Sequence, residues 1–173
     1  MQEKEKIGIE IERKYIIKMP DLSILSSCDR YGRSDIVQTY LKSIDGVTRR
    51  VRKRTEDGVS RYYETVKVRI DKMSSTEVER EISEDEYSEL LTFAREDSTP
   101  IEKVRHVFYY GGQLFEIDVY PAWKNTAIME TELDDREREV EIPTFIEIIR
   151  EVTGYKAYSN ASMSKSFPKE DVF

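Results

Sequence analysis

The chain has 173 residues, a length that fits one domain with a sizeable core. Hydrophobic residues make up 38% and charged residues 36%, which is the composition of a highly charged globular protein and not of a disordered one. The net charge of −7 at pH 7 argues against a nucleic-acid binder that relies on a positive field over its whole surface. We therefore expect a single domain over residues 1–173, with no nucleic-acid partner.

The cysteine count and the lack of long apolar runs predict the location. Cys28 has no second cysteine for an intramolecular disulfide and no metal-ligand spacing around it, so we interpret it as a structural or surface thiol. The first ten residues, MQEKEKIGIE, are charged and lack an apolar signal core. No run approaches the roughly 20 apolar residues of a membrane helix. These features predict a cytoplasmic protein with no membrane partner.

Alternation of apolar and polar residues with a period of two dominates the chain and predicts strands. In residues 7–17, Ile7 and Ile9 fall on one face of a strand, whereas Glu10 and Glu12 fall on the other. Asp-Gly and Gly-Gly pairs, which accept positive φ, then separate further strands as hairpin turns. The predicted strands are 7–17, 36–43, 47–55, 61–70, 76–82, 102–110, 113–120 and 127–134.

Helical patterns are fewer. Ser83 and Glu86 form a capping box, which predicts a helix that ends before Pro100. A second helix is predicted over 143–152, and short helices are expected near 20–28 and 160–167. Eight strands with few helices predict an α+β, mainly β fold: an eight-stranded antiparallel β-barrel tunnel with helices packed outside.

On seven of the eight predicted strands, one face carries charges of a single sign. Like charges on one strand face repel, and exposed surfaces usually mix both signs. We therefore interpret these faces as the lining of a polar interior, for which a barrel of about eight strands has room. The acidic pairs are Glu10 and Glu12, Glu79 and Glu81, Glu116 and Asp118, and Glu130 and Glu132; the basic sets are Arg50, Arg52 and Arg54, Lys67 and Arg69, and Lys103 and Arg105.

Such an interior needs a ligand that satisfies both signs. Crowded carboxylates raise one another's pKa values, and a divalent cation relieves this repulsion; oxygen ligands suit Mg²⁺ or Mn²⁺. Arginine and lysine side chains hold phosphate oxygens. A polyphosphate together with divalent metal ions satisfies both sets, and this combination is usual in phosphoryl transfer.

The order of these motifs resembles that of the CYTH superfamily, also called triphosphate tunnel metalloenzymes. The family's hallmark Glu-x-Glu-x-Lys is matched by residues 10–14, EIERK. The resemblance spans roughly residues 7 to 165. The later matches are, in the family's order, Arg50-Val51-Arg52, Thr65-Val66-Lys67, Glu79-Arg80-Glu81, Lys103-Val104-Arg105, Glu116-Ile117-Asp118 and Glu130-Thr131-Glu132.

The resemblance implies a tunnel that binds a triphosphate and one or two divalent metal ions, Mg²⁺ or Mn²⁺. The implied metal ligands are Glu10, Glu12, Glu130 and Glu132, with Glu79, Glu81, Glu116 and Asp118 in second rank. The implied phosphate contacts are Lys14, Arg50, Arg52, Lys67, Lys103 and Arg105, with Lys165 as a further candidate that reads equally well as an exposed helix lysine. For hydrolysis, the resemblance implies a metal-activated water, and the candidates for its base are Lys14, Glu10 and Glu12.

The resemblance leaves the activity open among several possibilities. Hydrolysis of inorganic tripolyphosphate is favoured, because no feature looks like a device for recognising a base. The alternatives are a thiamine triphosphatase, a class IV-type adenylate cyclase that makes cyclic AMP from ATP, and a non-catalytic polyphosphate-binding protein. The oligomeric state also stays open, with a homodimer among the options.

Two residues with reactive or stacking side chains are not assigned to the site. His106 is out of phase with Lys103 and Arg105, so we expect it to face outward. Trp123 is interpreted as a packing residue and not as a platform for a nucleobase or a thiamine ring.

Overall fold

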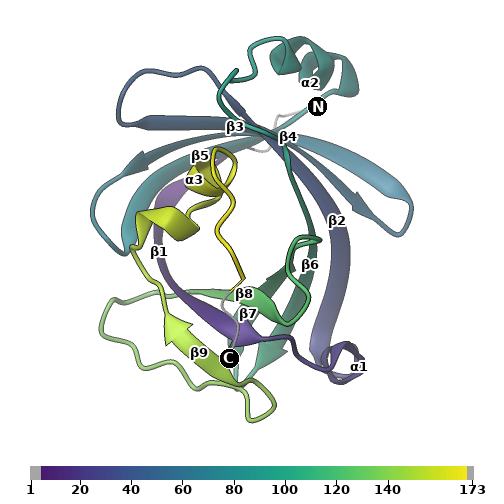
Figure 1. Ribbon diagram of the computed structural model, residues 1–173, viewed down its shortest axis with the longest axis vertical. Coiled ribbons are helices and arrows are strands. Elements are labelled where there is room, and N and C mark those ends of the chain that lie inside the picture. Colours follow the sequence, from purple (N-terminus) through teal and green to yellow (C-terminus); the bar gives the residue numbers. More distant parts are fainter. Residues whose placement is uncertain (1–4, 171–173) are drawn as a thin grey trace.

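The computed structural model describes residues 5–170 and consists mainly of β-strands (Figure 1). The charged residues 1–4, part of the segment that argued against a signal core, lie outside the described residues. The strands are β1 (Glu5–Lys18), β2 (Asp29–Leu41), β3 (Val47–Glu56), β4 (Val59–Arg69), β5 (Ser74–Ile82), β6 (Ile101–Tyr110), β7 (Gln113–Val119), β8 (Thr126–Glu132) and β9 (Ile148–Glu151). The helices are α1 (Leu22–Leu25), α2 (Glu84–Leu91), the 3-10 helix η1 (Lys156–Tyr158) and α3 (Asn160–Met163).

Eight of these strands form a closed antiparallel barrel, as the alternation predicted. Their hydrogen-bonded order is β5-β4-β3-β2-β6-β7-β8-β1, and β1 also pairs with β5. Strand β1 closes the ring because its two halves have different neighbours: residues 5–11 pair with β5, and residues 12–18 pair with β8. In Figure 1 the strands curve round a common centre, with α2 on one side of the ring and α1 on the opposite side.

The predicted helix over 143–152 is wrong. Residues 148–151 form the ninth strand, which pairs with residues 15–17 of β1. One edge of β1 pairs with β5 over residues 5–11 only. Without a further partner, the backbone groups beyond residue 11 on this edge would be unpaired, and β9 pairs with them at residues 15–17. A ten-residue helix is marginal by itself, and the adjacent β-branched residues Ile148 and Ile149 suit a strand.

All three α-helices are short and begin at a side-chain cap, of which the sequence predicted the one at Ser83. The Ser83 hydroxyl accepts a hydrogen bond from the backbone N–H of Glu86 at 3.1 Å, which confirms the capping signal of α2. Helix α2 lies on the outer face of the barrel, where Tyr87 packs against Leu41, Val51 and Ile82. In residues 5–170 no helix is both long enough and apolar enough to cross a membrane.

The largest apolar cluster lies outside the barrel wall. Ile117 alternates along β7 with Glu116 and Asp118, so it faces outward when they face inward. The irregular segment between β8 and β9 covers this outer face. The cluster contains Tyr15, Ile17, Leu25, Phe108, Phe115, Ile117, Ala127, Met129 and Ile146, with Val140, Ile142 and Phe145 packed against it.

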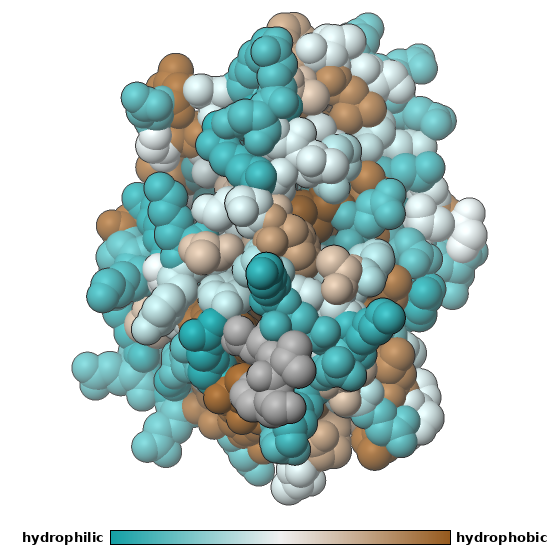
Figure 2. All heavy atoms as spheres, viewed as in Figure 1, coloured by the Kyte–Doolittle hydropathy of each residue, from teal (hydrophilic) through white to brown (hydrophobic). Residues whose placement is uncertain are grey.

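A second cluster, the apolar plug, closes one end of the lumen. Ile16, Ile101 and Ile128 are in phase with the charged residues of their strands, so they face inward at this end. The chain after β9 crosses the ring there (Figure 1), and the space-filling view from the same side shows its centre filled with atoms (Figure 2). The plug consists of Ile16, Ile101, Tyr120, Trp123, Ile128, Val152, Tyr158 and Met163.

The turn between β4 and β5 is held against the turn that follows β9. The Arg69 guanidinium donates to the carbonyl oxygens of Asp71 and Lys72 at 2.8 and 2.7 Å. Gly154 has a φ of +75°, and a Cβ added there would lie 2.8 Å from Cβ of Lys72. The close approach therefore requires glycine for two separate reasons, backbone conformation and space.

A pair of glycine substitutions separates these two reasons. Gly112 has the same φ of +75° but open space around it. We expect Gly112→Ala to lower the free energy of unfolding by about 1 kcal/mol through the left-handed backbone alone. Gly154→Ala should cost at least about 1 kcal/mol more, because Lys72 or its turn must shift. Urea unfolding of both variants checks this, and equal losses would show that the two turns are not tightly packed.

Candidate active site

The strand register brings the predicted charged residues onto the inner face of the barrel. Residues directly opposite each other in an antiparallel pair share a face. The opposing pairs of this inner face are Glu12 with Glu132, Lys14 with Glu130, Glu116 with Glu130, Arg105 with Asp118, and Thr65 with Glu79. Residues far apart in the sequence therefore line one lumen.

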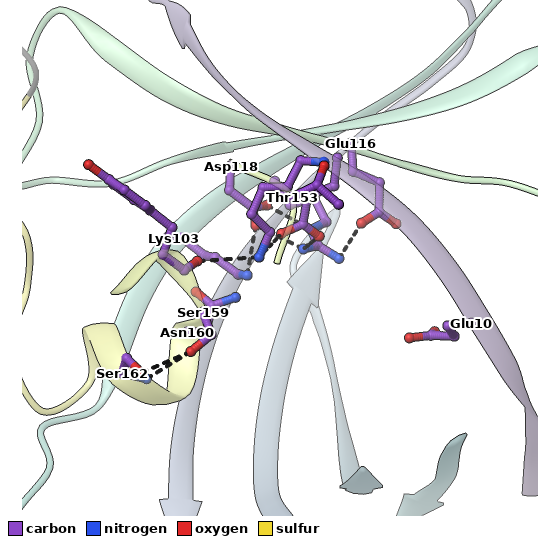
Figure 3. Close-up of polar contacts among 12 residues, drawn as sticks. Glu10, Lys103, Glu116, Asp118, Thr153, Ser159, Asn160 and Ser162 are labelled. Carbon is purple, nitrogen blue, oxygen red and sulfur yellow. Dashed lines mark hydrogen bonds and ion pairs between the residues drawn. The ribbon is translucent and has the colours of Figure 1, made fainter. Parts of the chain in front are cut away.

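Beside the plug, Asp118 is the centre of a buried network. Its side chain and that of Lys103 are each only 1% exposed, and the Lys103 ammonium lies 2.7 Å from the carboxylate. Arg105 donates to both oxygens of Asp118, at 2.7 and 2.8 Å, and pairs with Glu116 at 2.6 Å. Figure 3 shows Lys103, Glu116 and Asp118 joined by these contacts, with Glu10 apart from them.

Lys14 connects this network to the end of the chain. Its ammonium lies 3.0 Å from Glu130 and donates to the backbone oxygen of Tyr158 at 3.3 Å. Its backbone N–H donates to the hydroxyl of Thr153 at 3.0 Å. The segment that carries the plug therefore also positions Lys14.

Further charge pairs line the opposite wall. Arg52 pairs with Glu79 at 3.0 Å, and the Thr65 hydroxyl donates to the same carboxylate at 2.9 Å. Lys67 lies 3.3 Å from Glu10 and 3.5 Å from Glu77. In this ligand-free lumen, therefore, many of the charges satisfy one another.

The pKa values report how strongly these groups depend on their partners. Burial would raise the pKa of Asp118, but the Arg105 and Lys103 charges hold it well below its usual range. Burial lowers the pKa of Lys103 to about 8, because the attraction of Asp118 does not offset burial and the repulsion of Arg105. Burial also opposes the charge on Lys14, but Glu130 and Glu12 raise its pKa above the usual value. Lys14 is therefore protonated at neutral pH.

Four carboxylates line one small hollow of the lumen: Glu12, Glu116, Glu130 and Glu132. Burial raises the pKa of Glu116, and the charges of Glu130 and Asp118 raise it further although Arg105 opposes them. Within residues 5–170, no three His, Cys, Asp or Glu side chains are already arranged to hold a metal ion. The donor chemistry nevertheless fits a hard divalent cation, because all four side chains supply oxygen and a cation would relieve their repulsion.

Strand β3 presents the complementary feature, buried guanidinium N–H groups without partners. The Nε atoms of Arg50, Arg52 and Arg54 are buried and have no hydrogen-bond partner within residues 5–170. Burial and the neighbouring Arg50 lower the pKa of Arg52 to about 10, so Arg52 stays protonated at neutral pH. Buried donors are normally paired, so this row is suited to an anion with several oxygens.

Two of the predicted site residues do not join the charged residues that line the lumen. Lys165 pairs with Asp97 at 3.3 Å, and its side chain is 42% exposed. Glu81 lies on β5 opposite Tyr63 and is exposed. The other predicted site residues face the lumen.

Sequence reasoning missed three inward-facing residues. Glu77 is in phase with Glu79 along β5, so the same alternation could have identified it. Ser34 and Gln38 lie on β2, and Ser34 precedes the predicted start of that strand at residue 36. The start was misplaced because residues 29–35 are polar and the pairing of β2 with β6 has an irregularity between Asp29 and Gly32.

Comparisons with known proteins agree with this geometry. No protein-family model matches the chain, and no curated protein matches it. Among solved structures, the inorganic triphosphatase NE1496 is 25% identical over 92% of this chain and 96% of its own, with a TM-score of 0.59. The chain has the triphosphate tunnel fold of the CYTH superfamily.

Two further solved structures share this fold at lower identity. The PH1819 protein from Pyrococcus horikoshii OT3 is 21% identical over 73% of this chain and 80% of its own, with a TM-score of 0.56. HpAC1 from Hippeastrum, described as a putative adenylyl cyclase with a dominant triphosphatase activity, is 16% identical over 73% and 81%, with a TM-score of 0.51. At these identities the likeness concerns the tunnel fold alone.

The outward direction expected for His106 is confirmed, and this residue provides a pH test of the tunnel wall. His106 is 3% exposed, and its Nδ1 lies 2.9 Å from the Tyr31 hydroxyl. Burial lowers its pKa, and the charge of Arg33 lowers it further. Below about pH 6.5 the unfolded chain gains a proton that the folded chain resists, so the stability that the neutral imidazole contributes is lost on acidification.

We expect the stability advantage of the wild type over His106→Gln to shrink between pH 7.5 and pH 5. Glutamine does not titrate, so the variant lacks this component, which amounts to about 1.4 kcal/mol for each unit of pKa shift. Urea unfolding of both proteins at the two pH values measures the difference. An advantage that stays constant or grows on acidification would contradict a buried neutral His106.

Glu132→Gln tests whether the acidic hollow of the tunnel holds a metal ion. We expect the variant to bind Mn²⁺ about tenfold more weakly than the wild type in calorimetry, because one oxygen ligand loses its charge. Glu102→Gln is the matched control, since Glu102 is also exposed but lies out of phase with Lys103 on the outer face of β6. Equal Mn²⁺ affinity in all three proteins would remove Glu132 from the metal site.

Proposed function

We propose that this chain is a divalent-metal-dependent triphosphatase that hydrolyses inorganic tripolyphosphate inside the tunnel. One observation carries the proposal: a single lumen contains both a row of unpaired arginine donors and a hollow lined by four carboxylates. A triphosphate with divalent metal ions satisfies both sets, whereas either ligand alone leaves one set crowded. The likeness to the inorganic triphosphatase NE1496, which covers 92% of this chain, supports the same reaction.

Substrate binding exchanges the partners of the lumen charges. Phosphate oxygens compete with Glu79 for Arg52 and with Asp118 and Glu116 for Arg105. The carboxylates released in this way are buried (Asp118) or half-buried (Glu79 and Glu116) and would lack a partner, so cation binding and substrate binding stabilise each other. When bound, Mg²⁺ or Mn²⁺ would neutralise the charge of phosphate oxygens and lower the pKa of a water molecule bound to the ion.

The charges around Lys14 favour a role for it as a phosphate contact. In the ligand-free tunnel Glu130 and Glu12 raise the pKa of Lys14, which favours its cationic form. This supports a carboxylate, Glu10 or Glu12, as the general base, and Glu12 lines the acidic hollow with Glu116 and Glu130. Proton acceptance by a carboxylate close to the attacking water matches this position.

The apolar plug supports an inorganic substrate over a nucleotide. Trp123 is buried and packs edge-on against Tyr120 and Phe167, with ring centroids 5.6 and 5.4 Å away. Its indole N–H donates to the backbone oxygen of Pro168 at 3.0 Å. This tryptophan is therefore engaged in packing and is not free to stack on a base, as the sequence led us to expect.

Phosphate release from tripolyphosphate, ATP and thiamine triphosphate, each with Mg²⁺, Mn²⁺ or EDTA, tests the function. We expect release from tripolyphosphate that depends on the metal ion, and no cyclic AMP in the ATP reactions. Lys67→Ala should lower turnover at least about tenfold, since it removes a lumen cation, whereas His106→Gln should leave turnover unchanged. Cyclic AMP formation would assign a cyclase instead, and binding of tripolyphosphate without release would assign a non-catalytic binder.

A further inference from the structure

Strand β2 contributes an uncharged stripe to the lumen between two basic strands, and within this stripe the buried Ile36 lies between the polar residues Ser34 and Gln38. It lies between β3, which carries Arg50 and Arg52, and β6, which carries Lys103 and Arg105. On its inner face, Gln38 is opposite Arg52, Tyr40 is opposite Arg50, and Ser34 is opposite Arg105. Because neighbouring strands lie about 4.8 Å apart, this stripe separates the two basic rows by about 10 Å.

Two groups of this stripe are buried without a partner. Gln38 is 0% exposed and Ser34 is 1% exposed. Among the residues that the structure describes, the side-chain oxygens Oε1 of Gln38 and Oγ of Ser34 have no hydrogen-bond partner. A buried polar atom without a partner destabilises the ligand-free protein, so its position calls for an explanation by function.

The neighbours of Gln38 decide which end of its amide faces the lumen. The amide and the Tyr40 hydroxyl are 3.3 Å apart, with the amide nitrogen placed toward the hydroxyl. The Tyr40 hydroxyl is also hydrogen-bonded to Arg50, and a guanidinium can only donate. The hydroxyl proton therefore remains to be donated, and the amide oxygen can accept it once the amide is turned by 180°.

In that orientation the amide N–H₂ of Gln38 faces the lumen beside the unpaired Nε of Arg52. We propose that Gln38 is a further substrate-binding residue, which donates an amide N–H to an oxygen of the bound triphosphate and is positioned by Tyr40. The inference rests on the proposed function. It gives the tunnel a neutral donor between Arg52 on β3 and the apolar Ile101 on β6, where a further cation would be repelled by Arg52 and buried beside the plug.

Three variants of Gln38 and Tyr40 test the assignment by tripolyphosphate binding. Calorimetry in EDTA gives the affinity without hydrolysis, and KM with Mg²⁺ gives it during turnover. Gln38→Leu removes the donor at similar volume and should weaken binding about tenfold. Gln38→Glu leaves only acceptors and adds a negative charge, so it should weaken binding further.

Tyr40→Phe tests the positioning role by its dependence on Gln38. It should weaken binding in the wild-type background and have a smaller effect in a Gln38→Leu background, where the hydroxyl keeps only its hydrogen bond to Arg50. Additive losses in the double variant would overturn this role for Tyr40.

The unfolding temperature of the ligand-free protein separates a binding role from a structural one. Gln38→Leu removes an unpaired amide N–H₂ but also the hydrogen bond between the amide and the Tyr40 hydroxyl, so its unfolding temperature should fall no further than that of Tyr40→Phe, which loses the same hydrogen bond. A larger fall than in Tyr40→Phe would assign Gln38 to the fold and overturn the proposal. Wild-type affinity in Gln38→Leu or Gln38→Glu would also overturn it, with the proposed function intact. A wild type that neither binds nor hydrolyses tripolyphosphate would overturn the proposed function, and this inference with it.

Discussion

Closure of the barrel by β1 is the constraint on which the other features depend. The first half of this strand pairs with β5 and the second half with β8, so every strand of the ring has two neighbours. In a closed barrel, every second side chain of each strand points into the lumen. Glu12 and Lys14 are thereby enclosed with Arg105 and Glu130 instead of facing water. Ion pairs that would contribute little on a surface become strong and mutually dependent in this enclosure.

The charged side chains inside the lumen are only partly paired with one another. Lys103 and Arg105 together satisfy the carboxylate of Asp118, whereas the Nε atoms of the β3 arginines and the hollow beside Glu116 are left without full compensation. A core selected for stability alone would replace such groups with apolar ones. Uncompensated positive charge therefore remains on one wall and uncompensated negative charge on another. A polyanion and a cation bound together would neutralise both. Stability and ligand binding therefore draw on the same side chains.

Apolar packing supports this polar interior from two directions. The outer cluster holds β6, β7 and β8 in place through residues that alternate with the lumen charges, such as Ile117 and Phe115. The apolar plug closes one end of the lumen, and in the same chain segment the backbone oxygen of Tyr158 accepts a hydrogen bond from the Lys14 ammonium. Water is excluded from one side of the charge network, which lowers the local dielectric constant and strengthens its interactions. The same strands and the same segment after β9 therefore provide the apolar packing, position the lumen charges and close one end of the lumen.

The sequence by itself determined the strand pattern, the like-signed faces and the cap of α2, because each follows from local alternation or a local hydrogen bond. It also identified Glu10, Arg50 and Lys103 as members of an inner face. The tertiary structure alone decided that residues 148–151 form a strand, since the free edge of β1 outweighs local helix propensity. It alone placed Lys165 beside Asp97, and it alone brought Gln38 between two basic strands. Periodicity assigns a residue to a face, but partners across strands depend on register and closure, which no local pattern encodes.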